Sequence, residues 1–98
     1  MEVKRATEEL RSLFQNLPVG FPEGADSVEG NYEHLLLIPL EYEADRRVFG
    51  ELRALEIMEF WSTDHYTRLY RIVLDKEHRA TLESILKKHH LFPTRDQP

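Results

Sequence analysis

Apolar residues recur every three or four positions near the N-terminus and predict an amphipathic helix over residues 2–17. The stripe that would face a core consists of Val3, Ala6, Leu10, Leu13, Phe14 and Leu17. Pro18 has no amide hydrogen to continue a helix, and Gly20 follows it, so we expect the helix to end there. Residues 18–31 contain three glycines and two prolines without periodicity. They predict a long loop, which is uncommon unless it is functional and is therefore a candidate contact surface.

The stretch at residues 32–42, YEHLLLIPLEY, is apolar on both alternating faces and predicts a strand that is covered on both sides. Pro39 cannot donate to a ladder, so we expect it at a bulge, near the end of the strand, or with its nitrogen facing outward. Residues 43–54 place Ala44, Val48 and Leu52 on one helical face and predict a short helix. Gly50 weakens this prediction, and a loop is the alternative.

Residues 54–61 and 66–74, with a turn near Thr63 and Asp64, predict a β-hairpin. One register places two opposite-charge pairs and two apolar pairs across the hairpin, which favours it over a register shifted by one residue. The pairs are Glu59 with Arg68, Glu56 with Arg71, Trp61 with Tyr66, and Ile57 with Tyr70.

Asp75 is a good N-cap for a final helix over residues 76–90, and residues 93–98 form a polar tail. The predicted order is α-β-α-β-β-α in one domain, residues 1–98, with helices packed on an antiparallel sheet. Its last five elements match a ferredoxin-like half-open sandwich without a clear fourth strand, preceded by an extra helix. If residues 43–54 are a loop, the order becomes α-β-β-β-α, as in a double-stranded-RNA-binding domain.

Composition limits the possible functions. Eighteen acidic and thirteen basic residues give a net charge of −5, which makes nucleic-acid binding an unlikely function for this domain. The chain has no cysteine, so disulfides, thiolate metal sites and a cysteine nucleophile are excluded. It contains neither a metal-binding motif nor a nucleotide-binding motif, and we expect no cofactor. No apolar run approaches the ~20 residues that span a bilayer, so we expect a soluble cytoplasmic protein without a membrane partner.

A sheet that is apolar on both faces needs something to cover the second face: the first helix, another subunit or a ligand. The absence of a catalytic motif favours a small non-enzymatic binding or regulatory module that binds a protein partner or forms a homodimer. Aromatic side chains dominate interface energetics, so the hairpin is the expected interface. Its residues there are Trp61, Tyr66, Tyr70, Ile57 and Arg68.

A small-ligand sensor or small enzyme with a cavity between sheet and helices is the alternative. Topology would bring His34 near Asp75 and His78, which could form a metal or acid–base site, although Asp75 as a helix cap with solvent-facing histidines is the favoured explanation. At the other end of the sheet, His65 and Asp64 could lie near Glu41 and Glu43 and act in acid–base chemistry.

Overall fold

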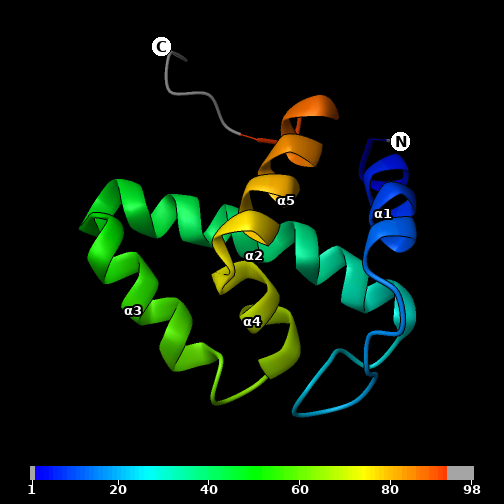
Figure 1. The fold of residues 1–98 in the computed structure, drawn as a ribbon, viewed down its shortest axis with the longest axis horizontal. Coiled ribbons are helices and arrows are strands. Elements are labelled where there is room, and N and C mark those ends of the chain that lie inside the picture. Colours follow the sequence, from blue (N-terminus) through cyan, green and yellow to red (C-terminus); the bar gives the residue numbers. More distant parts are fainter. Residues whose placement is uncertain (1, 93–98) are drawn as a thin grey trace.

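The computed structural model describes residues 2–92, and these residues form five helices and no strand. The helices are α1 (Glu2–Leu13), α2 (Val28–Phe49), α3 (Glu51–Trp61), α4 (Thr67–Leu74) and α5 (Lys76–Lys88) (Figure 1). The predicted α+β, ferredoxin-like sandwich is therefore wrong, and the α-β-β-β-α alternative fails with it. The polar tail predicted at 93–98 lies outside the described residues.

Helix α2 is the centre of the fold and contacts each of the other four helices (Figure 1). Its buried side chains include Tyr32, Leu35, Ile38 and Tyr42, whose spacing of three or four residues places them on one face of the helix. The opposite face is not uniformly polar, since it carries exposed apolar residues such as Leu37, and the sequence therefore resembles that of a strand buried on both sides. For this reason the strand predicted at 32–42 is wrong.

Two residues expected to break regular structure have different effects here. Pro39 is fully buried inside α2, where it leaves the carbonyl of Leu35 without its usual helical donor. Gly50 has φ +89° and ψ 165°, a conformation that is open essentially only to glycine, and it separates α2 from α3. The segment 43–54, predicted as one short helix, is thus the end of α2 and the start of α3.

The hairpin predicted at 54–74 is a pair of helices, α3 and α4, which double back at the turn 62–66. Helix α4 begins after Tyr66, which has φ +49° and provides no side-chain cap. Its first amides are instead satisfied by the α1–α2 loop: Thr67 donates to the carbonyl of Pro22 at 2.9 Å, and Arg68 donates to that of Glu23 at 3.1 Å. The long loop therefore has a structural role.

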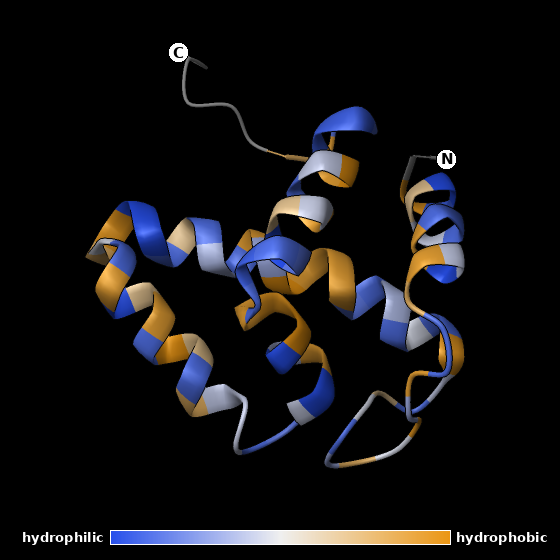
Figure 2. Cartoon of the chain, in the orientation of Figure 1, coloured by the Kyte–Doolittle hydropathy of each residue, from blue (hydrophilic) through white to orange (hydrophobic). Residues whose placement is uncertain are grey.

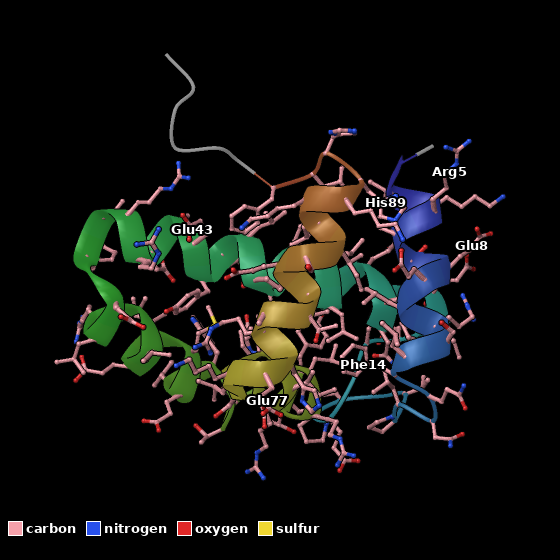
Figure 3. The ribbon with its side chains drawn as sticks, turned by 45° about the horizontal axis from the view of Figure 1, so that its top comes forward. Arg5, Glu8, Phe14, Glu43, Glu77 and His89 are labelled. Atoms are coloured by element: carbon pink, nitrogen blue, oxygen red, sulfur yellow. The ribbon has the colours of Figure 1, made fainter. Side chains whose placement is uncertain are left out.

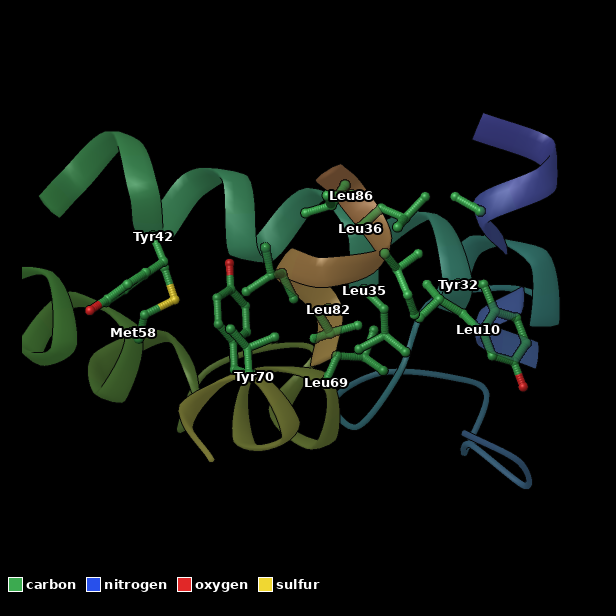
Figure 4. Packing of buried hydrophobic residues seen from close by; sticks show 14 of the residues in the cluster. Leu10, Tyr32, Leu35, Leu36, Tyr42, Met58, Leu69, Tyr70, Leu82 and Leu86 are labelled. Carbon is green, nitrogen blue, oxygen red and sulfur yellow. The ribbon is translucent and has the colours of Figure 1, made fainter. Parts of the chain in front are cut away.

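The core runs along α2, with Leu10 and Tyr32 near one end and Tyr42 and Met58 near the other (Figure 4). Helix α5, predicted over residues 76–90, closes it with Leu82, Ile85 and Leu86. Asp75 is the N-cap of α5, as predicted, because its carboxylate accepts hydrogen bonds from the amides of Glu77 and His78.

Candidate functional site

A pocket of about 390 Å³ lies between α2, α3 and α4. Helix α2 contributes two carboxylates and a small apolar side chain, α3 contributes apolar and aromatic side chains, and the residues that follow add two more rings. The lining consists of Glu41, Ala44, Asp45, Ile57, Met58, Trp61, His65 and Tyr70.

Three rings form one corner of this pocket. The centroid of His65 lies 4.9 Å from that of Trp61 and 6.1 Å from that of Tyr70, with interplanar angles of 67° and 86°. Such edge-to-face contacts are favourable, and they set the rings as walls at steep angles rather than as a flat stack. The Nδ1 atom of His65 lies 2.8 Å from the carboxylate of Asp64, which fixes the orientation of the imidazole ring.

The carboxylates of Glu41 and Asp45 come from successive turns of α2 and therefore lie on the same side of the helix. The buried Tyr70 hydroxyl donates a hydrogen bond to Glu41 Oε1 at 3.1 Å. Burial raises the pKa of the Tyr70 hydroxyl strongly, and the negative charges of Glu41 and Asp45 raise it further. Tyr70 therefore stays protonated and remains a hydrogen-bond donor to Glu41. The carboxylates of Glu41 and Asp45 give the pocket a negative electrostatic potential.

The structure brings five of the candidate site residues named from the sequence to this pocket: Glu41, Ile57, Trp61, His65 and Tyr70. Tyr66 lies beside them, with its ring 5.1 Å from that of His65 and 4.3 Å from that of His34. Both predicted apolar pairs of the hairpin thus lie at or beside one site, although the elements that carry them are helices.

The predicted charge pairs and the histidine cluster are placed differently. Arg68 is exposed and contributes its amide to the loop contact, and the expected pairing with Glu59 is not formed. Of the predicted histidine cluster, His78 lies 3.8 Å from Asp75 and packs against Phe14. His34 does not join them, because it contacts the carbonyl of Gly30 and the ring of Tyr66. Within residues 2–92, no group of three or more His, Asp or Glu side chains is placed to hold a metal ion.

Sequence reasoning placed Glu41 near His65, but it missed Asp45 and placed Glu43 wrongly. Glu43 faces the other side of α2, where Arg46 and Arg47 bind its nearly buried carboxylate at 2.7 Å each (Figure 3). The four-residue spacing of Glu41 and Asp45 was the available signal, because in a helix it places both carboxylates on one face. In a strand the same spacing also places both carboxylates on one face, but about 13 Å apart and therefore too far apart to line one small pocket.

A second pocket of about 330 Å³ lies between α1, α2 and α5 and is mostly aliphatic. Leu36, Leu37 and Leu40 form its α2 side, and Leu86 and Leu91 form its α5 side. It offers few polar groups that could orient a ligand, so the aromatic and acidic pocket is the better candidate site.

None of the five helices has the length and apolar character that crossing a bilayer requires, as far as residues 2–92 are concerned. Comparison of this chain with protein-family models, with curated proteins and with solved structures gives no match.

Proposed function

We propose that this protein is a non-enzymatic binding module that accepts a side chain or small group of a partner in the pocket between α2, α3 and α4. The observation that carries the proposal is the corner formed by Trp61, His65 and Tyr70 beside two carboxylates. Ligand sites are typically concave and largely apolar, with a few convergent polar groups, and span ~300–1,000 Å³. The pocket is at the lower end of this range, which suits a single side chain.

The chemistry of the lining favours binding over catalysis. Its titratable groups are Glu41, Asp45, His65 and Tyr70, and no serine or threonine nucleophile is among the lining residues. His65 is paired with Asp64, whose side chain is 61% exposed, so water competes for this carboxylate–imidazole pair. The role of the pair in orienting a ring is sufficient to explain it.

A protein is the favoured partner because exposed apolar side chains lie beside the pocket and at the bend between α2 and α3. Phe60 is 62% exposed, and its ring meets that of Trp61 at 5.0 Å. Val48, Phe49 and Leu52 are also exposed at the bend between α2 and α3. Figure 2 shows hydrophobic colouring of the ribbon at this bend. A cluster of exposed apolar residues is typical of a contact surface. The cytoplasmic location expected from the sequence stays a prediction.

The direct test is an amide NMR titration with the N-acetyl amides of the common amino acids as probes. At least one probe is expected to shift the amides of residues 41, 45, 61, 65 and 70 in a saturable manner. Trp61→Ala should abolish this response while the protein keeps its fold and melts cooperatively, because a partly buried ring at a binding site contributes mainly to association. If no probe shifts these amides, or if Trp61→Ala unfolds the chain, the proposal is wrong.

Self-association is a second candidate, and the exposed bend between α2 and α3 is the observation in its favour. Leu52 is 75% exposed there, and Val48 is 72% exposed. Sedimentation or light scattering at high concentration should then give a dimer, and Leu52→Glu should return it to a monomer. A monomer at every concentration excludes the homodimer and leaves the partner a different protein.

A further inference from the structure

On the basis of the function proposed above, we propose that the pocket between α2, α3 and α4 binds an alkylated ammonium group. Such a group combines a permanent positive charge with an apolar outer surface. Aromatic rings and carboxylates in one cavity recognise it through cation–π attraction and Coulomb attraction together. A methylated lysine side chain and a small quaternary amine share this chemistry.

The ring geometry suits a cation. Trp61 is the best cation–π partner among the natural side chains, and Tyr70 is also a good one. Because the rings around His65 meet at 67° and 86°, the corner can contact a compact group from more than one direction. A flat planar ligand would instead favour parallel rings.

The charge of the lining selects against anions. Glu41 and Asp45 line the pocket, and no lysine or arginine does. Neither of these carboxylates forms an ion pair with any side chain of residues 2–92. Glu43 on the opposite side of α2 is, by contrast, held by two arginines. Like charges four residues apart destabilise a helix, so the pair Glu41 and Asp45 gains from a cation that binds between them.

The remaining lining residues favour an alkylated ammonium over a bare one. Ile57, Met58 and Ala44 provide apolar contacts, which methyl or methylene groups can fill without losing hydrogen bonds to water. A primary ammonium or a metal ion would give up strongly bound water in the same position. The pKa of the Tyr70 hydroxyl is raised by burial and then by Glu41 and Asp45. The negative charge of these two carboxylates therefore acts on an aromatic ring that lines the pocket.

The test uses choline and its uncharged carbon isostere, 3,3-dimethylbutanol, which have nearly the same shape. Trp61 is the only tryptophan of the chain, so its fluorescence reports on the pocket directly. Choline should change the emission in a saturable manner and bind about tenfold more tightly than the isostere, since cation–π attraction is worth that much at a partly desolvated site. Equal binding of the two compounds overturns the cation inference and leaves the proposed binding function intact.

Two charge variants separate the electrostatic contribution from folding. Glu41→Gln keeps an oxygen that can accept the hydrogen bond from Tyr70, and Asp45→Asn preserves the shape of its side chain. Together they should weaken choline binding about tenfold, with little change in binding of the isostere. Glu59→Gln is the matched control, because Glu59 is exposed on α3 outside the pocket and its loss changes net charge by the same amount as either single variant. Equal effects of Glu59→Gln and Asp45→Asn would overturn the proposal.

A peptide that carries one trimethyl-lysine distinguishes the two sources of the group. Binding of the peptide well above that of choline indicates a side chain of a partner protein, and the reverse order indicates a free amine. The same peptide with an unmodified lysine should bind several-fold more weakly. If choline and the trimethyl-lysine peptide both leave the Trp61 emission unchanged, the inference is wrong, and the amide screen alone decides the proposed function.

Discussion

Asn31 on α2 accepts a hydrogen bond from the buried amide of Ala25 at 2.8 Å. Its side-chain nitrogen donates to the carbonyl of Pro18 at 2.9 Å. The buried side chain of Asn31 thus holds two positions of the loop between α1 and α2, Pro18 and Ala25, in place. The same loop provides the carbonyls that cap α4, the helix of Tyr70. The loop, α4 and the pocket are therefore mechanically connected.

Asn31→Ala should lower the free energy of unfolding by about 1–3 kcal/mol, because it leaves the Ala25 amide buried without a partner. Hydrogen exchange at the amides of Thr67 and Arg68 should accelerate as the loop loosens. Asp26→Ala, at an exposed neighbouring position, should change stability by no more than about 0.5 kcal/mol. Unchanged exchange at Thr67 and Arg68 would show that the loop does not hold α4.

Gly24→Ala should damage the same loop by a steric route. A Cβ atom at Gly24 would lie 2.0 Å from the Pro18 carbonyl oxygen and 2.8 Å from Asn31 Oδ1. Neither atom can move without loss of the hydrogen bonds of Asn31, so we expect a cost of about 3 kcal/mol in chemical denaturation. Gly20→Ala is the comparison, since a Cβ atom there would have free space and the φ of +107° adds backbone strain of about 1–3 kcal/mol without a steric clash. A smaller effect at Gly24 than at Gly20 would contradict this account.

The elements that were predicted correctly have signals within a few residues of one another. Asp75 followed by an apolar stripe at helical spacing identifies α5, and the stripe with Ala6 and Leu10 identifies α1, although Leu13 of the predicted stripe is exposed. Even there, α1 ends at Leu13, before the predicted end at residue 17. Helix α1 shows a clear amphipathic pattern because it is covered on one side only.

The central helix α2 could not be identified from periodicity, because apolar residues on its exposed face and polar residues on its buried face obscure the pattern. Leu37 and Val48 are exposed, Asn31 and Glu43 are buried, and Pro39 within the helix argued against a helix. The hairpin is wrong, but the residues that it paired, Ile57 with Tyr70 and Trp61 with Tyr66, lie at or beside one pocket. Two consecutive elements that double back bring the same residues together whether they are strands or helices. The position of Asp45 at the pocket could be predicted only from helical periodicity, and it was missed.

Glu43 provides a third prediction, since its nearly buried carboxylate is bound by both Arg46 and Arg47. Removing Arg46 alone leaves Arg47 in place, and we expect a loss of only about 1 kcal/mol. The double variant with both arginines changed to alanine should lose about 3 kcal/mol or more, because the buried charge is then unpaired. Arg53→Ala, which breaks the exposed pair with Glu56, should cost less than about 0.5 kcal/mol. Additive losses from the two single arginine variants would contradict a shared role.

The contact between α1 and α5 predicts a specific dependence of stability on pH. Glu9 of α1 accepts from His89 Nε2 at 3.0 Å and from Lys88 Nζ at 3.2 Å, and Figure 3 shows His89 beside α1. The hydrogen bond from His89 and then that from Lys88 lower the pKa of the Glu9 carboxyl below its ordinary value of 4.5. A carboxyl group whose pKa is lowered by folding stabilises the protein above its unfolded pKa, and this contribution is lost as the pH falls through the folded pKa.

The wild type should therefore melt at a higher temperature than Glu9→Gln at about pH 6, and the difference should shrink as the pH falls below about 4.5. Differential scanning fluorimetry across this range measures it, and hydrogen exchange in α1 should show the same trend, since α1 is held partly by this contact. Glu8→Gln is the matched control, because Glu8 is the exposed neighbour of Glu9 in α1. This substitution removes the same charge without changing the contact with α5. A melting difference for Glu9→Gln that stays constant from about pH 6 to 3 would mean that Glu9 acts through packing and not through its charge.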